Sequence, residues 1–443
     1  MSSEKSCAIV AGDIGGLTVA GGAGRAERGM TSYSGDEMTT REATATAELK
    51  RNWPALIAAA WGCCVGLTGL MFYSFSTFVP LFESREGWSR GQISIALPAT
   101  ALGFLFAAPF AGRLIDRYGV RRVLLISIPM LAFGLLLPSI ASRAPWTLWM
   151  CYLLLSVIGI GASPIAYARL ITARFNRARG LALGITLAGT GVSAIALPPI
   201  MTALTQTYGI TGGYVGLAVL ALTPWLYVAL FVREIPMSTP APSSASEATK
   251  PLSAPRGAST GNTWRFAVIA ASFFVVSLGL VGVVVHLVAM MRDAGLDAAR
   301  AAIVASGVGV GVIAARVLIG WILDHVYAPM VAVVVFVAAA IGCLLLAHGG
   351  TGQAVLAAGL IGVAIGGEID IIAYLVSRYF PPGRFGSIYG WQYGLFTVGA
   401  GLSPVLINAL RTPDGAYTTS LTIAAIAAVV GGLPLLALGR YRY

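Results

Sequence analysis

Five ionisable side chains interrupt long apolar stretches of this sequence: Arg169, His286, Arg316, Glu368 and Asp370. A charge inside a lipid-embedded helix is costly, so such a residue is a functional candidate by default. An arginine guanidinium stays charged and offers a planar fork that matches a carboxylate. Arg316 is therefore the predicted anchor for an anionic solute. The alternative is a static ion pair with Asp370 that holds two helices together.

The two acidic residues lie only two positions apart, so they point to different sides of one helix. Asp370 shares a face with Tyr374 and is the better candidate for a proton-linked role. Glu368 is expected to pair with Arg169 and act as a gate. For each of these roles the alternative is a static structural pair. His286 is expected to be either a structural histidine or a pH-sensitive solute contact.

Aromatic and amide side chains in the same stretches can donate hydrogen bonds to a carboxylate or pack beside it. The predicted solute-binding set is Arg316, Tyr374, Tyr73, Tyr167, His286 and Gln392. Tyr389, Trp391 and Tyr393 are further candidates, with packing as the alternative. Neither a metal-ligand cluster nor a Gly-x-x-x-x-Gly-Lys-Ser/Thr loop occurs, so neither a metal, a cofactor nor enzymatic activity is expected.

The elements that carry these residues must be membrane helices. The chain is 57% hydrophobic and 11% charged, with a mean hydropathy of +0.81, whereas soluble domains carry about 25% charged residues. Crossing about 30 Å of hydrocarbon takes about 20 residues, and the runs are continuous, which excludes a β-barrel. Twelve spans are predicted: 53–80, 93–114, 123–141, 146–170, 180–203, 212–232, 266–290, 299–323, 329–348, 354–376, 385–408 and 417–438.

The chain also divides into halves. Residues 1–50 are predicted to be a disordered cytoplasmic tail, and 51–233 and 265–443 to be two six-helix bundles. A segment rich in Pro, Ser and Ala, 234–264, is the predicted cytoplasmic linker. Gly112-Arg-Leu-Ile-Asp116 in the first half lines up with Gly320-Trp-Ile-Leu-Asp324 in the second. Such a parallel repeat predicts a solute site between the bundles.

The net charge of +11 comes from arginines in short loops rather than from a basic face with aromatics. This distribution follows the positive-inside rule and places both termini in the cytoplasm. It does not give the basic footprint of a nucleic-acid-binding protein. A monomer in a bacterial inner membrane is expected.

The stretch Gly112-Arg-Leu-Ile-Asp116-Arg117-Tyr-Gly119-Val-Arg121-Arg122 resembles the signature of the loop between helices 2 and 3 in the major facilitator superfamily. The resemblance extends over residues 53–440. It implies an all-α membrane protein, with twelve helices in two pseudo-symmetric bundles, that carries a solute by alternating access. It also implies a charge-and-dipole latch; the alternative is a basic loop that only sets topology. The predicted latch residues are Gly112, Asp116, Arg117, Gly119, Arg121 and Asp324.

Three further segments resemble the monocarboxylate and oxalate–formate branch of that superfamily. They are Glu86-Gly-Trp88-Ser-Arg90, residues 173–184, and Arg316-Val-Leu-Ile-Gly320. The acidic residue that animal carriers place one turn before the helix 8 arginine is Val312 here. The resemblance implies secondary transport of a monocarboxylate or short dicarboxylate, with protons as a candidate coupling ion. The alternative is a proton-coupled exporter of hydrophobic or cationic compounds that uses Glu368 and Asp370.

Overall fold

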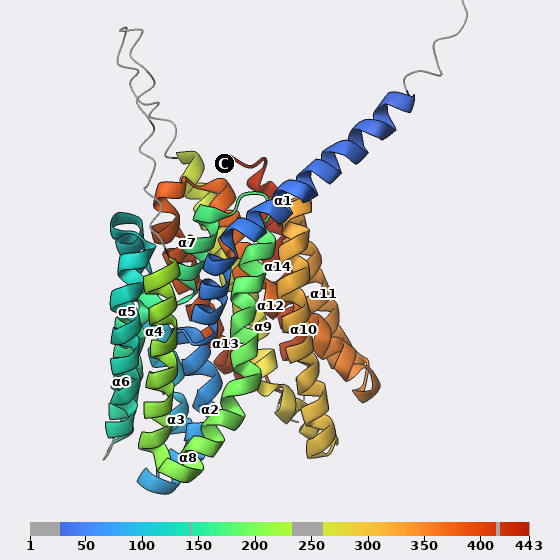
Figure 1. The fold of residues 1–443 in the computed structure, drawn as a ribbon. Helices are drawn as coiled ribbons and strands as arrows, with labels where there is room; N and C mark the ends of the chain where they lie inside the picture. The colour runs from blue at the N-terminus through green and yellow to red at the C-terminus, as the bar shows by residue number, and fades with distance from the viewer. Residues whose placement is uncertain (1–26, 142–143, 233–259, 413–416, 443) are drawn as a thin grey trace, which may run out of the picture. The chain divides into compact units, whose positions relative to one another are not determined.

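A computed structural model describes residues 27–141, 144–232, 260–412 and 417–442, and these residues form helices and connecting turns without any strand. Residues 1–47 and 48–443 form separate compact units, and every predicted site residue belongs to the second unit. Figure 1 shows the helices with their labels. The helices are α1 (Glu27–Cys64), α2 (Leu67–Glu86), α3 (Arg90–Ser94), α4 (Ala96–Tyr118), α5 (Val120–Leu136), η1 (Leu137–Ile140), α6 (Pro145–Ile158), η2 (Ile160–Ala162), α7 (Pro164–Arg174), α8 (Arg179–Phe231), α9 (Thr260–Asp293), α10 (Ala298–His325), α11 (Ala328–His348), η3 (Thr351–Gln353), α12 (Ala354–Tyr379), η4 (Pro382–Arg384), α13 (Phe385–Ala409), α14 (Thr418–Gly432) and η5 (Leu433–Leu438).

Nine helical stretches of the described residues are long and apolar enough to cross a membrane. One of them, α8, has 53 residues and would be about 80 Å long if straight. Its backbone leaves the helical region at Gly209 (φ 68°, ψ −166°), so α8 contains two successive spans. The pair α6–α7 and helix α13 provide the remaining two. The prediction of twelve membrane helices is thus confirmed.

Some predicted boundaries are wrong. Part of the tail predicted to be disordered is helical, because α1 begins at Glu27; residues 1–26 lie outside the described residues. The predicted linker also overlaps a helix, since α9 begins at Thr260, and 233–259 lie outside the described residues. Two spans predicted to be continuous are interrupted, the first between Cys64 and Leu67 and the fourth at η2.

The two interruptions contact each other. The Cys64 carbonyl at the first break accepts a hydrogen bond from the Ser193 hydroxyl of α8. At the second break, the Ser163 hydroxyl accepts from the Ile165 amide at 3.4 Å and so caps α7. A Cβ on Gly66 would lie 2.7 Å from the Ala162 carbonyl oxygen, so only glycine allows this approach. Non-helical backbone at membrane depth is tolerated only where protein or a cavity satisfies it.

The two bundles meet along two helix pairs, α4 with α13 and α8 with α10. Gly112 of α4 lies against the backbone of Gly386 in α13, and Gly390 lies one turn further along against Ala108. On the pseudo-symmetric side, Gly180 of α8 lies against Gly320 of α10. Small residues allow helix backbones to approach closely in membranes. Gly386, Gly390 and Gly394, at four-residue spacing, thus form the face of α13 that packs on α4.

Within the second bundle, α10 packs against α12 through glycines. A Cβ on Gly311 would lie within 2.3 Å of the Gly359 carbonyl oxygen and 3.1 Å from Gly362, whereas a Cβ on Gly309 would meet nothing within 4 Å. We therefore expect Gly311→Ala to destabilise the protein by about 1–3 kcal/mol, because the two backbones must separate. Gly309→Ala on the same helix should change stability by less than about 0.5 kcal/mol. Thermal unfolding in detergent measures both, and equal effects would contradict this account of the α10–α12 contact.

Candidate functional site

The close α10–α12 contact places Arg316 beside Asp370. Arg316 Nη1 donates to Asp370 Oδ1 at 3.1 Å, and the two side chains are 5% and 0% exposed. The bond is single rather than bidentate: Arg316 Nε and Asp370 Oδ2 have no hydrogen-bond partner among the described residues. The ion pair foreseen as the alternative for Arg316 thus exists, but it leaves part of both side chains unsatisfied.

Glu368 is completely buried, and neither of its carboxyl oxygens has a hydrogen-bond partner within the described chain. The predicted gate pair with Arg169 is wrong for this structure. Arg169 Nε instead lies 3.8 Å from Asp116 Oδ1, and its guanidinium lies over the Phe385 ring. Asp116 lies within one helix turn of the loop between α4 and α5, so Arg169 interacts at that end of the bundles. Arg316 remains the charge whose field reaches Glu368.

Side chains of the first bundle and of α13 surround this acid–base cluster. The charge of Arg316 acts on Cys63 of α1 and on Tyr389 and Tyr393 of α13. The Tyr393 hydroxyl hydrogen-bonds Thr68 of α2 at 3.2 Å, which links the two bundles. The Tyr389 hydroxyl has no partner among the described residues. Arg316 therefore faces the opposite bundle, not lipid.

Tyr167 of α7 joins this cluster from the first bundle. Its ring fills the space where Gly62 lacks a side chain, it lies near Cys63, and its buried hydroxyl has no partner in the described structure. Tyr73 of α2 is half-buried and lies within electrostatic range of Tyr393. Both belong to the predicted solute-binding set. We call Arg316, Glu368, Asp370, Tyr167, Tyr389 and Cys63 the central cluster.

Three other predicted solute contacts form separate interactions. The Tyr374 hydroxyl accepts from Arg378 Nη2 at 3.1 Å, towards the end of α12. His286 Nε2 lies 3.1 Å from the Pro404 carbonyl oxygen, which fits the structural alternative. Gln392 Nε2 donates to the Phe266 carbonyl at 3.0 Å within the second bundle. Of the predicted solute-binding set, the structure thus brings Arg316 and Tyr167 into the central cluster, with Tyr73 near Tyr393, and places these three elsewhere.

Two carboxylates cap helices of the opposite bundle. Asp116 of α4 accepts from the backbone N–H groups of Gly386 and Ser387 at 2.9 and 2.8 Å, at the start of α13. Asp324 of α10 accepts from Gly180 and Leu181 at 2.7 and 2.9 Å, at the start of α8. Helix N-termini carry unpaired N–H groups and a positive partial charge, so a carboxylate stabilises them. Both caps join the two bundles, and the two carboxylates are the matching residues of the sequence repeat.

The other predicted latch residues shape the same end of the bundles. Gly119 adopts φ 86° in the turn between α4 and α5, a backbone conformation that favours glycine. Arg121 Nη2 donates to the Ala229 carbonyl at 2.9 Å near the end of α8. Arg117 lies over the Tyr118 ring. These three contacts stay within the first bundle, so only Gly112, Asp116 and Asp324 of the predicted set reach across.

Sequence reasoning missed several bonds at this end. Arg179 Nη1 of α8 donates to the Ser377 hydroxyl at 3.2 Å, and Arg378 Nη2 of α12 donates to the Asn176 carbonyl at 3.4 Å. Glu48 accepts from the backbone N–H groups of Asn176, Arg177 and Ala178 at 2.8–3.0 Å, just before α8. The basic run 174–179 was a sequence signal for such contacts. Glu48 gave no such signal because it lies outside the predicted apolar spans.

Comparison with known proteins agrees with this architecture. The description "Major Facilitator Superfamily" belongs to the family model that matches residues 61–404 and 267–441. Monocarboxylate transporter 11 of Homo sapiens is 28% identical over 400 residues, covering 84% of this chain and 80% of the relative. Multidrug resistance protein MdtG of Citrobacter koseri is 32% identical over 195 residues, 41% of this chain and 46% of that protein.

A solved structure shares the fold at low identity. The human organic anion transporter MFSD10 superposes with a TM-score of 0.65 at 14% identity, covering 87% of this chain and 99% of the other. The twelve membrane helices, the repeated carboxylate caps and the matching family model lead to one assignment: the chain is a multi-pass membrane protein of the Major Facilitator Superfamily.

Proposed function

We propose that the chain is a secondary transporter of a small organic anion, a monocarboxylate or short dicarboxylate, with Arg316 as the solute anchor. The observation that carries this proposal is the incomplete Arg316–Asp370 pair between the bundles. The guanidinium offers five N–H donors in a fixed fork, and Asp370 takes one of them. A solute carboxylate can occupy the rest of the fork or displace Asp370 from it.

The tyrosines and the helix breaks favour the same class of solute. Tyr389, which the charge of Arg316 reaches, and Tyr167, which lies near Cys63, have buried hydroxyls without partners among the described residues. The break before Leu67 gives α2 an N-terminus without a side-chain cap at the level of Cys63. Broken transporter helices direct such positive helix ends at anionic groups of their solutes. The curated relatives named monocarboxylate transporters support this reading.

The caps of Asp116 and Asp324 act as the latch of alternating access. They hold the bundles together at the end that carries the loop between α4 and α5. The arginines in this loop place it in the cytoplasm by the positive-inside rule. The conformation described is then closed towards the cytoplasm, in a bacterial inner membrane, with both termini on that side. Solute binding at the central cluster would favour opening by its differential affinity for the two states.

Glu368 is the proposed proton carrier. Glu368 has no hydrogen bond within the described chain, and the nearby Arg316 is already paired with Asp370. Such a buried carboxylate is costly in hydrocarbon, and a proton removes that cost. Asp370 is the proposed exchange partner of the solute because it already binds the guanidinium. Proton binding and anion binding then meet within one cluster, which couples the two gradients.

Export of hydrophobic or cationic compounds with proton coupling is the second candidate function. The partial similarity to the multidrug resistance protein MdtG favours it, as does the unpaired Glu368, which could meet a positive solute. Transport of a lipophilic cation that is independent of Arg316 but lost in Asp370→Asn would favour this candidate over the first.

Arg316→Gln combined with Asp370→Asn tests the anchor. Neutralising both partners leaves no unpaired buried charge, so folding should persist. Carboxylate uptake into proteoliposomes should fall about thirty-fold or more, because a buried charged partner is worth about 2–5 kcal/mol to binding. Arg316→Lys, which keeps the charge without the fork, should also lose most uptake. Full uptake of a panel of short radiolabelled carboxylates by the double variant would discard the anchor.

Glu368→Gln tests the proton carrier. The neutral amide cannot release a proton, so accumulation driven by a pH gradient should disappear while exchange of labelled for unlabelled solute at equal pH continues. Asp297→Asn is the control. It removes an exposed carboxylate at the start of α10, outside the central cluster, and should leave both activities intact. Undiminished gradient-driven accumulation in Glu368→Gln would refute this role.

Asp116→Asn and Asp324→Asn test the latch. Loss of charge at a helix N-terminus costs about 0.3–2 kcal/mol, so each variant should shift the population towards the state open at this end by up to about thirty-fold. Spin-label distances between the α4–α5 loop and residues 382–384 report that opening. Asp293→Asn at the other membrane face should not change them. Unaltered distances in the double variant would mean that the caps are not a latch.

A further inference from the structure

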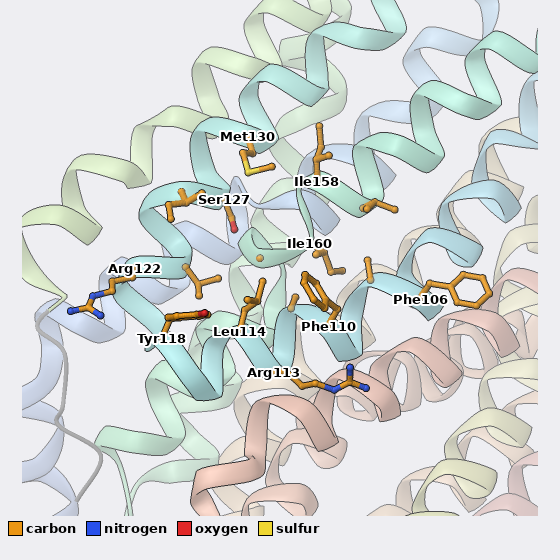
Figure 2. Close-up of a pocket in the computed structure, with 16 residues that line it drawn as sticks. Phe106, Phe110, Arg113, Leu114, Tyr118, Arg122, Ser127, Met130, Ile158 and Ile160 are labelled. Atoms are coloured by element: carbon orange, nitrogen blue, oxygen red, sulfur yellow. The ribbon is translucent and has the colours of Figure 1, made fainter.

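A groove lies on the outer side of the first bundle, between α4 and α5, with a volume of about 860 Å³. Residues 157–161, at the end of α6 and in η2, form its floor. The groove exists because α4 packs mainly against α6 and α13, whereas α5 packs mainly against α8. These successive helices therefore diverge. Figure 2 shows Tyr118 and Arg122 at one end of the groove and Phe106 at the other.

The walls of the groove are apolar and open to the membrane. Phe106, Phe110, Ile126 and Met130 line it, and they are between 42% and 74% exposed. From Tyr118 to Phe106 is twelve residues along α4, or about 18 Å. One leaflet of the hydrocarbon core is about 15 Å thick. The groove therefore has the length and surface chemistry of a site for a lipid chain from one leaflet.

Charge gathers near the loop end of the groove. Arg122 lines it there, together with the half-exposed Tyr118. Arg113 lines the groove partway along α4, and Figure 2 shows its guanidinium apart from Arg122 and Tyr118. Arg113 also lines a second cavity, together with two other arginines and the carboxylate of Asp116. No acidic residue is among the described residues that line the groove. Basic residues at the membrane surface attract anionic head groups, and basic pockets between membrane helices bind them specifically.

We infer that this groove binds an anionic phospholipid, with an acyl chain between α4 and α5, the phosphate against Arg122 and the Tyr118 hydroxyl, and the positive charge of Arg113 nearby. The bound lipid supports α4 on the side opposite its contact with α13. Because α4 carries Gly112 and Asp116, the occupied groove holds the helix that forms one of the two caps. The site is distinct from the central cluster, which faces the other bundle.

Native mass spectrometry of the full-length protein in detergent tests the site, with phosphatidylglycerol and phosphatidylcholine of identical acyl chains as probes. Phosphatidylglycerol should bind the parent protein more tightly than phosphatidylcholine. The double variant Arg113→Gln/Arg122→Gln should lose about thirty-fold in phosphatidylglycerol affinity, because each surface basic residue contributes about 1 kcal/mol and a factor of ten corresponds to about 1.4 kcal/mol. Its phosphatidylcholine affinity should hardly change.

Two matched variants separate this site from general charge effects. Arg300→Gln removes one positive charge from the exposed start of α10 and should retain the preference for phosphatidylglycerol. Ile126→Trp fills the groove from an exposed position and should weaken the binding of both lipids, although the arginines are unchanged. Equal binding of the two lipids to the parent protein would overturn the inference. So would unchanged phosphatidylglycerol affinity in both the double arginine variant and Ile126→Trp.

Discussion

Lipid offers no hydrogen bonds, so each polar group that this chain buries within the bilayer depends on partners inside the protein. Arg316 and Asp370 meet this constraint because glycines bring α10 and α12 close enough for a 3.1 Å bond. They meet it only in part, since one nitrogen of the guanidinium and one oxygen of the carboxylate find no partner in the described chain. A buried group that keeps unused hydrogen-bonding capacity favours a ligand that completes it. The proposed anion site follows from that deficit.

The same constraint explains the junction of the bundles. At the start of α8 and of α13, N–H groups that the helix cannot pair are taken by carboxylates from the opposite bundle. In the other state of a transport cycle these N–H groups must find water instead. Water can reach them only at a membrane surface, which is where both caps lie. A junction with two discrete sets of partners behaves as a switch between two states.

The sequence predicted what depends on local pattern. Twelve spans, the repeated Gly–Asp motif and the isolated Arg316 were all visible from composition and spacing. The breaks at Cys64 and at η2 were not, because the apolar runs continue through them and their partners, Ser193 and Gly66, come from other spans. The Arg169–Glu368 pair was predicted wrongly because depth along a helix says nothing of its rotation or its neighbours. Cys63 was missed as a neighbour of Arg316 because a thiol in an apolar run has no distinguishing signal.

The position of Asp370 on α12 affects how the bundles can move. Val312 stands where the resemblance to animal monocarboxylate carriers implies an acidic residue, and Gly366 of α12 packs on the backbone of Val312. The counter-charge is Asp370 instead, on a neighbouring helix of the same bundle. Rocking of one bundle against the other leaves such a pair intact, whereas it must break the Asp116 and Asp324 caps. In the proposed mechanism the solute therefore acts on the pair by competing with Asp370, whereas the motion between the two states breaks and re-forms the caps. Tyr167, Cys63 and Thr68 approach the cluster from the other bundle and so connect the ion pair with the bundle that moves against it.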